Sequence, residues 1–322
     1  MSLSLRFLGT SAARPTVERG VSSIALVREG ETLLFDCGEG TQRQMMRYGV
    51  SFSFEDIFFT HFHGDHVIGA IGLFRTLALQ GRTEGVRLWG PRGAKRVLRA
   101  VAHFGVDRVG FPVEIEELAP GDAVKRSGYA IVPYAAEHGG APALGYALVE
   151  EERRGRFNPE LARELGVPEG PMWGQLHRGI AVTLEDGRVV DPSVLVGPRR
   201  PGRKVVLSGD SRPSEATVEV AHGADVLVHE ATFGDEEAAR AKETGHSTAR
   251  EAADVAARAG VRRLVLTHFS ARYSRDTNDL VREARERFPE TVAARDGIEV
   301  DVPYVPEESD VGAGEGAPPR SG

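Results

Sequence analysis

The chain has 322 residues, of which 41% are hydrophobic and 27% charged, and its 40 Lys and Arg against 47 Asp and Glu give a formal net charge of −7. This composition is typical of a globular protein, and the length suits either roughly two average domains or one large α/β domain that carries an insertion. The single cysteine, Cys37, excludes an intramolecular disulfide and a cysteine-based zinc finger. The negative charge argues against a nonspecific coat on nucleic acid but leaves room for a local basic patch.

The beginning of the sequence has neither the basic leader nor the apolar run of a secretion signal. No stretch reaches the ~18 uncharged apolar residues of a membrane span, because even the apolar region 67–79 is interrupted by Arg75. We therefore expect a cytoplasmic protein with no membrane partner, which also agrees with its low cysteine content.

Strands and helices are mixed along the chain. Short apolar runs bounded by Gly, Asp and Thr predict strands at residues 3–9, 22–30, 31–38 and 56–63. Apolar residues at helical spacing predict helices at 66–81 and 93–103. The second half repeats this pattern, with strands predicted at 204–210, 225–230 and 263–269 and helices at 235–242 and 248–259.

The segment from about residue 151 to 203 differs from the rest because it is rich in Gly, Pro and Arg. Between residues 153 and 204, ten basic residues stand against six acidic ones. We expect an arm inserted into a domain of residues 1–305, although composition alone fits a solvated loop equally well. Residues 306–322 are small, polar and rich in Gly and Pro, so we expect a disordered tail there.

Residues 61–66 read HFHGDH, directly after the apolar run DIFFT. At the end of an extended strand, residues two apart point the same way, so His61 and His63 can hold one ion. The chain must turn after Gly64, which lets Asp65 and His66 face a second ion. Three imidazoles and a carboxylate suit zinc or a comparable first-row ion.

Four residues are too few to close two metal sites, so other strand ends should supply further ligands. His138, Asp210 and His268 each lie just past an apolar strand-like run, the position from which an α/β sheet presents functional groups. Asp210 is the best candidate bridge, because a carboxylate can share its oxygens between cations ~3.5 to 4 Å apart. Taken alone, the two histidines fit a structural role as well as a ligand role, and Asp210 fits a turn.

The remaining histidines carry weaker signals. His246 precedes a Ser-Thr pair that predicts a helix cap, and His229 precedes Glu230. Either could orient a ligand or donate a proton to a leaving group. His103 lies in a helical pattern, where it faces solvent or core, and His177 and His222 have no supporting neighbours and are interpreted as structural.

These residues resemble the metallo-β-lactamase superfamily, whose HxHxDH hallmark matches residues 61–66, and more narrowly the ribonuclease Z family. The resemblance runs from about residue 3 to 303 and includes FLGTSAARPT, LLFDCGEGTQRQ, GRFNPELARELGVPEGP, LVHEATF, GHSTAREAA and LTHFSARY. HxHxDH indicates the superfamily but not the substrate, whereas the HEAT and HST elements and the Gly-Pro arm single out ribonuclease Z. Ser211 stands where the family often has Thr, and Phe62 where it often has Leu; neither change removes a candidate ligand.

The resemblance implies a fold and a set of site residues. The fold is a four-layer αββα sandwich of the α/β class, with two mixed sheets face to face and helices outside. The cofactors are two Zn²⁺ per subunit, or Mn²⁺ or another first-row divalent ion. One ion is held by His61, His63 and His138, the other by Asp65, His66 and His268, and Asp210 bridges them. Asp65 is then also the general base, and Glu230 and His246 form a proton relay.

The resemblance also implies a substrate, precursor tRNA, from which the 3′ trailer is cut to leave a 3′-hydroxyl on the tRNA and a 5′-phosphate on the trailer. It implies a homodimer and a tRNA-binding arm whose recognisable residues are Gly170, Pro171 and Leu176. Two alternatives remain open. One is another hydrolase of this fold, such as a small-molecule phosphodiesterase, a glyoxalase II-like thioesterase or a lactamase, none of which needs a basic arm. The other is a catalytically silent RNA-binding scaffold, which the full ligand set argues against.

Overall fold

A computed structural model describes residues 2–106 and 108–305, so the predicted disordered tail lies outside the described residues. The described chain forms two compact units. The larger, here called the core unit, contains residues 2–125, 130–148 and 203–305. The smaller, here called the arm unit, contains Arg126–Tyr129 and Val149–Gly202.

The first sheet has seven strands in the order β16-β1-β2-β3-β4-β5-β6. Their bounds are Glu299–Asp301 for β16, Leu3–Gly9 for β1, Ser23–Arg28 for β2, Glu31–Phe35 for β3, Asp56–Phe58 for β4, Val86–Gly90 for β5 and Val113–Glu117 for β6. Pairing is antiparallel from β16 to β3 and parallel from β3 to β6. Glu29 and Gly30 both have positive φ, as a tight hairpin turn between β2 and β3 requires.

The second sheet also has seven strands, in the order β15-β14-β13-β12-β9-β8-β7. Their bounds are Thr291–Ala293 for β15, Leu264–Thr267 for β14, Val226–Glu230 for β13, Lys204–Leu207 for β12, Leu144–Glu150 for β9, Tyr129–Ala135 for β8 and Val124–Arg126 for β7. Strands β12 to β15 are parallel. Their carboxyl ends therefore open onto one edge of the sheet, where polar residues that follow the strands come together.

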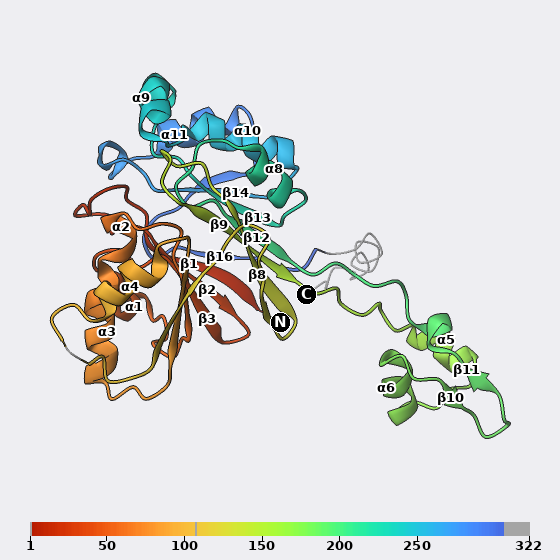
Figure 1. Ribbon diagram of the computed structural model, residues 1–322. Helices are drawn as coiled ribbons and strands as arrows, with labels where there is room; N and C mark the ends of the chain where they lie inside the picture. The colour runs from red at the N-terminus through yellow and green to blue at the C-terminus, as the bar shows by residue number, and fades with distance from the viewer. Residues whose placement is uncertain (1, 107, 306–322) are drawn as a thin grey trace, which may run out of the picture. The chain divides into compact units, whose positions relative to one another are not determined.

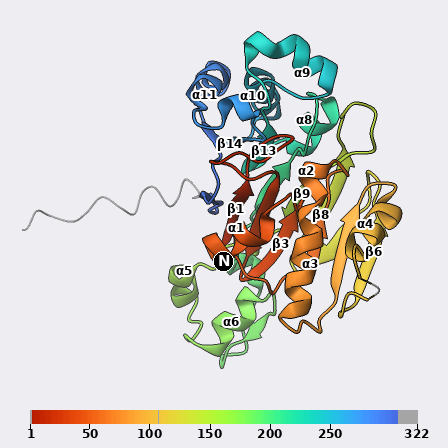
Figure 2. The same cartoon turned by 90° about the vertical axis from the view of Figure 1, so that its left-hand side faces the viewer.

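Helices cover the outer faces of the two sheets (Figures 1 and 2). On the side of the first sheet lie α1 (Thr41–Tyr48), α2 (Gly64–Val67), α3 (Gly69–Leu79) and α4 (Ala94–Ala102). On the side of the second lie α8 (Glu215–Ala221), α9 (Ala238–Thr244), α10 (Ala249–Ala259) and α11 (Asn278–Arg285), with short 3₁₀ turns at Asp235–Glu237 and Ala271–Tyr273. The core unit is thus an α/β sandwich of two mixed sheets, as predicted.

Each sheet packs its helices through a buried apolar cluster. Beneath the first sheet, Ile57 and Leu88 belong to the same cluster as Leu73 and Phe74 of α3. Beneath the second, leucines of β13 and β14 pack with the alanine-rich face of α10. Thr248 and Glu251 form a capping box at the start of α10, and Gly260 ends the helix in a left-handed conformation. These devices fix the segment that carries His246, two residues before the cap.

The arm unit has a small apolar core of its own. It contains α5 (Pro159–Glu164), α6 (Pro171–His177), β10 (Val182–Thr183), β11 (Val189–Val190) and α7 (Pro192–Leu195). Each helix begins with a proline, and Asn158 and Asp191 cap α5 and α7 through their side chains. The buried members of the core are Ala162, Val167, Leu176, Val182, Leu184, Val190 and Leu195.

The predicted elements of the core unit are mostly present, with two kinds of difference. The strand predicted at 56–63 ends at Phe58, so His61 and His63 lie in the loop beyond β4 rather than on the strand. The pattern also missed α1, α8 and α11 and the strands β6, β7, β9, β15 and β16, whereas the apolar run noted before His138 is β8. Among the described helices there is none whose length and hydropathy would suit a membrane span.

Candidate metal centre

The candidate site is built from loops at the ends of strands in both sheets. His61 and His63 follow β4, and Asp65 and His66 lie on α2. His138, Asp210 and His268 follow β8, β12 and β14. The structure brings all seven predicted ligands together: one group contains His61, His63, His138 and Asp210, and another Asp65, His66 and His268, with candidate ligand atoms within 4.8 Å of one another in each group.

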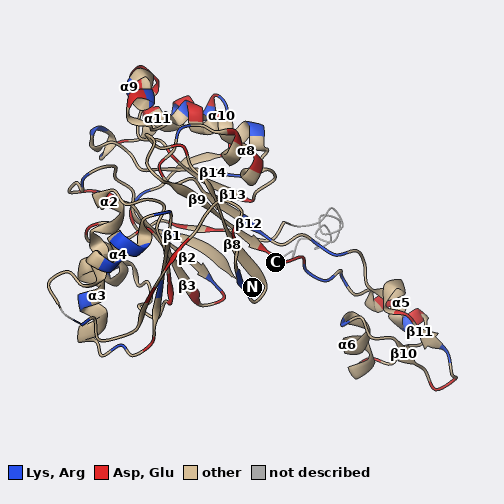
Figure 3. Ribbon diagram, in the orientation of Figure 1, with Lys and Arg blue, Asp and Glu red and all other residues tan. Residues whose placement is uncertain are grey.

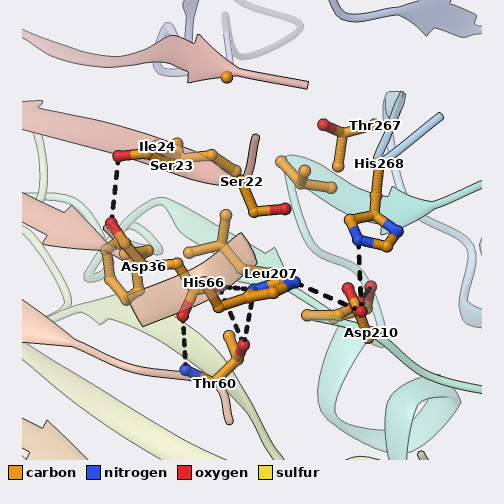
Figure 4. A pocket seen from close by; sticks show the side chains of 15 residues that line it. Ser22, Ser23, Ile24, Asp36, Thr60, His66, Leu207, Asp210, Thr267 and His268 are labelled. Atoms are coloured by element: carbon orange, nitrogen blue, oxygen red, sulfur yellow. Dashed lines mark hydrogen bonds and ion pairs between the residues drawn. The ribbon is translucent and has the colours of Figure 1, made fainter. Parts of the chain in front are cut away.

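Asp210 lies at the middle of this cluster. Its Oδ2 atom is 3.3 Å from Nε2 of both His66 and His268, which approach it from two different directions (Figure 4). The same oxygen lies 3.7 Å from Nε2 of His61 and 3.9 Å from Nε2 of His138. One carboxylate thus faces histidines of both groups, the arrangement expected of a residue shared between two cations.

Hydrogen bonds to Nδ1 orient several of these imidazoles. Nδ1 of His66 lies 2.8 Å from Asp36 Oδ2, and Nδ1 of His138 lies 2.9 Å from the Gly245 carbonyl oxygen. Nδ1 of His268 lies 2.8 Å from Thr232 Oγ1. Acceptors at Nδ1 select the tautomer whose Nε2 carries a lone pair, and that nitrogen faces the centre. The rings are therefore held ready to bind a cation.

The environment of His66 tests whether a metal fits. Its Nε2 is buried and forms no hydrogen bond within the described residues, although two carboxylate oxygens are near, Asp210 Oδ2 at 3.3 Å and Asp65 Oδ2 at 3.6 Å. Burial opposes charge on this ring, but Asp210 and Asp36 outweigh it and raise the pKa of His66 well above its usual value. Burial lowers the pKa of His61 and keeps it neutral, as a metal ligand must be. The carboxylates around His66 therefore favour positive charge at this position, and His61 offers a neutral imidazole; a first-row divalent ion can use both features.

Backbone strain occurs at one candidate ligand, His268, and at Ala13, which bonds to the candidate ligand Asp65. Asp65 Oδ2 accepts a hydrogen bond of 2.7 Å from the backbone N–H of Ala13, whose φ is 61°. His268 has a φ of 57°, a left-handed conformation that residues other than glycine rarely adopt, and its side chain is buried. Left-handed conformations of such residues cost free energy and persist where the surroundings enforce them. Here they aim Asp65 and His268 at the same centre.

Glu230 and His246 form a pair beside the cluster. Glu230 Oε1 lies 2.7 Å from His246 Nδ1 and also accepts from the backbone N–H of Ser211 at 3.0 Å. Oε2 accepts from the N–H and Oγ1 of Thr232 and from the N–H of Ser247. Burial opposes the charged form of His246, but the Glu230 carboxylate outweighs burial and raises the pKa of His246 to about 9.

This bonding separates Glu230 from the metal ligands. Glu230, His246, Asp210 and His268 also lie close enough together to form a metal-binding group. However, both oxygens of Glu230 are already occupied by the donors just described, so they have little capacity left for a cation. We therefore interpret Glu230 as the residue that orients His246.

A cleft of about 400 Å³ opens beside the cluster. His63, Asp65, Asp210, His246 and His268 line it, so four of the seven candidate ligands and His246 face this cleft. The rest of the lining comes from residues 12–14, from the segment that follows β13, from α9 and from the segment that follows β14: Ala12, Ala13, Arg14, Thr232, Phe233, Arg240, Thr244, Ser270 and Ala271.

Some residues of the site were missed by sequence reasoning. Asp36 directly follows β3, so its place after an apolar run gave the same signal as Asp210. Besides His66, it binds the N–H of Thr60 at 2.8 Å and Thr60 Oγ1 at 2.9 Å. Ala13 and Thr232 act through a backbone N–H and a hydroxyl group; both lie in segments that carry the resemblance, FLGTSAARPT and LVHEATF, but neither was singled out as a site residue. His229, left open by the sequence, is buried with Nδ1 bonded to the Glu230 carbonyl oxygen, a structural arrangement.

The residues singled out in the arm differ in exposure. Gly170 and Pro171 are exposed, and Gly170 has a φ of 122° that favours glycine at the start of α6. Leu176 is fully buried in the core of the arm unit, so it supports the unit rather than offering a contact surface. The charge of the arm unit also depends on its bounds: Glu150, Glu151 and Glu152 belong to it, and it then holds nine basic and nine acidic residues.

Two family models match parts of the chain. One, described as anti-Pycsar protein Apyc1, matches residues 3–98. The other, described as a beta-lactamase superfamily domain, matches residues 193–269. Each covers less than half of the chain.

Relatives over nearly the whole length are named ribonuclease Z. The protein from Gemmatimonas aurantiaca is 64% identical over 311 residues, which cover 96% of this chain and 99% of the relative. The relative from Myxococcus xanthus is 55% identical, covering 94% and 98%, and that from Haloferax volcanii is 51% identical, covering 98% and 99%.

Solved structures that resemble this chain include a tRNase Z and another protein of the metallo-beta-lactamase fold. The short form of human tRNase Z matches with a TM-score of 0.68 at 27% identity, covering 94% of this chain and 100% of that one. The metallo-beta-lactamase fold protein YhfI from Bacillus subtilis matches with a TM-score of 0.66 at 17% identity, covering 94% and 100%, which shows the fold alone.

Proposed function

The chain belongs to the ribonuclease Z family of the metallo-β-lactamase superfamily, and from this premise we propose that it removes the 3′ trailer of precursor tRNA with two zinc ions. Membership of this family makes the chain an endoribonuclease of tRNA 3′ processing, that is, a phosphodiester hydrolase. The identity and number of the metals, the product ends, the assembly and the role of each residue are parts of the proposal.

The proposed ligand sets follow the two groups around Asp210. His61, His63 and His138 hold one ion; Asp65, His66 and His268 hold the other; and Asp210 serves both. The donors are imidazole nitrogens and carboxylate oxygens, which zinc accepts readily and manganese also tolerates. Two such ions, when bound, would lower the pKa of a water molecule and neutralise charge on the phosphoryl oxygens.

The observation that carries the proposal is the Glu230–His246 pair at the rim of the ligand cluster. A ligand cluster alone would suit any hydrolase of this fold. Hydrolysis of an RNA strand, however, expels an alkoxide, a poor leaving group that needs a proton. His246 lines the cleft, and with Nδ1 bonded to Glu230 its Nε2 is the nitrogen left to donate that proton. The negative charge of Glu230 stabilises the protonated ring until the transfer.

The proposed reaction balances as a hydrolysis. Asp65 takes a proton from the attacking water, whose oxygen forms a new bond to phosphorus. The bond between phosphorus and the 3′ oxygen of the tRNA breaks, and that oxygen receives the proton of His246. The tRNA keeps a 3′-hydroxyl and the trailer keeps a 5′-phosphate. The hydrogen bond from Ala13 N–H to Asp65 Oδ2 fixes the orientation of the proposed base.

The arm unit is the proposed contact with the body of the tRNA. Five of its arginines lie on the two segments that lead into and out of it: Arg153, Arg154, Arg156, Arg199 and Arg200. Basic side chains there offer phosphate contacts that do not depend on sequence, so substrate binding should weaken as salt rises. We further propose that the enzyme works in the cytoplasm as a homodimer, with Gly170 and Pro171 at the exposed surface of each arm.

A comparison of two substrates tests the proposal. The metal-loaded full chain should cleave precursor tRNA with a much higher kcat/KM than bis(4-nitrophenyl) phosphate, and metal analysis should find about two equivalents per chain. A preference for the aryl diester, with precursor tRNA left intact, would instead support a small-molecule phosphodiesterase. A chain that holds metal but cleaves neither would support the silent scaffold.

A further inference from the structure

Two arginines line the cleft without a partner for their charge. Arg14 and Arg240 are exposed and share the cleft with His63, Asp65 and His246. Within the described part of the chain, neither guanidinium group forms a hydrogen bond or an ion pair with another side chain. Elsewhere in the core unit, by contrast, Arg87, Arg250 and Arg258 each bind a carboxylate.

The backbone that carries Arg14 is tightly fixed. Its carbonyl oxygen accepts a hydrogen bond of 2.9 Å from Ser11 Oγ, and the adjacent Ala13 N–H is bonded to Asp65. Further along the same loop, the buried Arg19 donates to the carbonyl oxygens of Ala294 and Ser274. The Arg14 guanidinium is thus carried by a backbone segment that is already ordered, which lowers the entropic cost of binding an anion.

Arg240 is positioned by an aromatic contact. It lies on α9, and its guanidinium carbon is 5.7 Å from the centroid of the Phe233 ring. The same ring lies 6.2 Å from the ring of His246. Phe233 therefore connects Arg240 to the proposed proton donor. Helix α9 carries charges of both signs (Figure 3), so Arg240 is not part of a generally basic helix surface.

We propose that Arg14 and Arg240 bind the phosphate groups that flank the scissile phosphodiester of the RNA strand; this inference rests on the proposed function. A guanidinium group matches the geometry of a phosphate and can bind it through two hydrogen bonds. A polynucleotide carries a phosphate on each side of the cut, whereas a small diester has none to offer. The two arginines are therefore specificity residues, which favour an RNA strand over an isolated phosphodiester and hold it in register with His246.

The first test compares glutamine variants on two substrates. Arg14→Gln and Arg240→Gln should each lower kcat/KM for precursor tRNA by about tenfold or more, the effect of losing a charge-assisted hydrogen bond. The loss on bis(4-nitrophenyl) phosphate should be at least several times smaller. Arg14→Lys and Arg240→Lys, which keep the charge, should recover part of the loss. Equal losses on both substrates, or no loss on RNA, would overturn the inference.

The matched control is Arg263→Gln. Arg263 is also exposed, but it precedes β14, whereas His268 follows that strand, so the two lie at opposite ends of it. This variant should cleave both substrates like the wild type. Thermal unfolding of all variants should match the wild type, because none of the three arginines is buried. A loss as large in Arg263→Gln as in the cleft variants would show a general effect of charge and overturn the assignment.

A second test locates the contacts. Precursor tRNAs are prepared with one neutral methylphosphonate linkage on either side of the cut. Each neutral linkage should weaken cleavage by the wild-type enzyme. For each arginine variant, one of the two neutral linkages should cause little further loss of activity, namely the linkage that replaces the phosphate bound by the missing arginine. Each variant should also reduce the slope of log kcat/KM against log salt by ~0.7, the value for one single-strand phosphate. If the losses caused by an arginine variant and by each neutral linkage are fully additive, the inferred phosphate contacts are overturned and the proposed function still stands. If the wild-type enzyme leaves precursor tRNA intact, the proposed function itself is refuted.

Discussion

Glu230 Oε1 and His246 Nδ1 lie 2.7 Å apart, at the rim of a cluster whose centre is Asp210. The carboxylate is buried, and the imidazole reaches the cleft. This relationship joins the two halves of the proposed chemistry, because the cluster binds cations while the pair supplies a proton. It also leads to predictions that separate proton donation from metal binding.

His246→Ala should lower kcat for precursor tRNA by about 10² to 10⁴, the usual contribution of a general acid. Glu230→Gln should act in the same direction, and the double variant should be no worse than His246→Ala, because the two residues act as a unit. The loss on bis(4-nitrophenyl) phosphate should be far smaller, since nitrophenolate leaves without a proton. Bound metal per chain should be unchanged. Loss of metal in these variants would mean that the pair supports the ligands instead.

Asp36→Asn should weaken metal binding by about ten- to a hundredfold. Asp36 accepts hydrogen bonds from His66 Nδ1 and from the N–H and Oγ1 of Thr60, and an amide would turn a donor towards one of these donors. Asparagine tolerates the positive φ of 58° at this position, so the backbone is preserved. Metal dissociation constants from competition with a chelator would measure the effect.

Asp56→Asn is the matched control for Asp36. Asp56 is an equally buried carboxylate, but it binds Arg87 and the indole N–H of Trp89 rather than a candidate ligand. The free energy of unfolding should fall in this variant, while the metal dissociation constant stays that of the wild type. If both variants lost metal alike, general destabilisation would explain the result and Asp36 would have no special role.

Removing most of the arm unit should separate tRNA recognition from catalysis. Arg153 and Arg200 are joined by two backbone hydrogen bonds, of 2.7 and 2.9 Å, so an Asn-Gly turn can replace residues 154–199 between them. The kcat/KM for precursor tRNA should fall by orders of magnitude, mainly through KM, and the loss on the aryl diester should be slight. Equal losses on both substrates would argue that the arm supports the fold of the core unit rather than tRNA binding.

Gly69→Ala should destabilise the fold by about 1 to 3 kcal/mol or more, as overpacking of a tight contact does. A Cβ atom at Gly69 would overlap the carbonyl oxygen of Gly38, so α3 would have to shift away from it. Gly72→Ala, in the same helix, meets only the side chain of Gln42 at 3.3 Å and should be neutral or stabilising by up to ~1 kcal/mol. Urea unfolding of both variants would measure the difference. Equal midpoints would contradict the close packing described for Gly69.

Much of the site was visible in the sequence because its residues follow apolar runs. An apolar run that ends in a polar residue predicts a buried strand with a functional group at its end, and Asp210 and His268 both obey this rule. HFHGDH adds four candidate ligands in one loop. The mixture of strands and helices, with these groups at strand ends, predicted an α/β protein with a metal centre, whereas the sandwich of two sheets was implied by the family resemblance.

Other features depend on contacts between distant segments and could not be read from local patterns. The hydrogen bond between Asp36 and His66 joins β3 to α2, and the one between Ala13 and Asp65 uses a backbone N–H that any residue would provide. The burial of Leu176 follows from how the arm unit packs, not from the Gly-Pro sequence nearby. The positive charge expected of the arm changed once the structure set its bounds, because three glutamates lie at its start.

The most direct measurement of the central proposal is cleavage of a precursor tRNA with a labelled 3′ trailer, with both product ends mapped. Wild-type enzyme, Asp65→Ala and chelator-treated enzyme are compared, and zinc is then restored to the last. We expect one cut directly before the trailer, with a 3′-hydroxyl on the tRNA and a 5′-phosphate on the trailer. Cleavage should be lost in Asp65→Ala and after chelation, and it should recover when zinc is restored. Cleavage that persists without metal, or a trailer released with a 5′-hydroxyl, would contradict the proposed function.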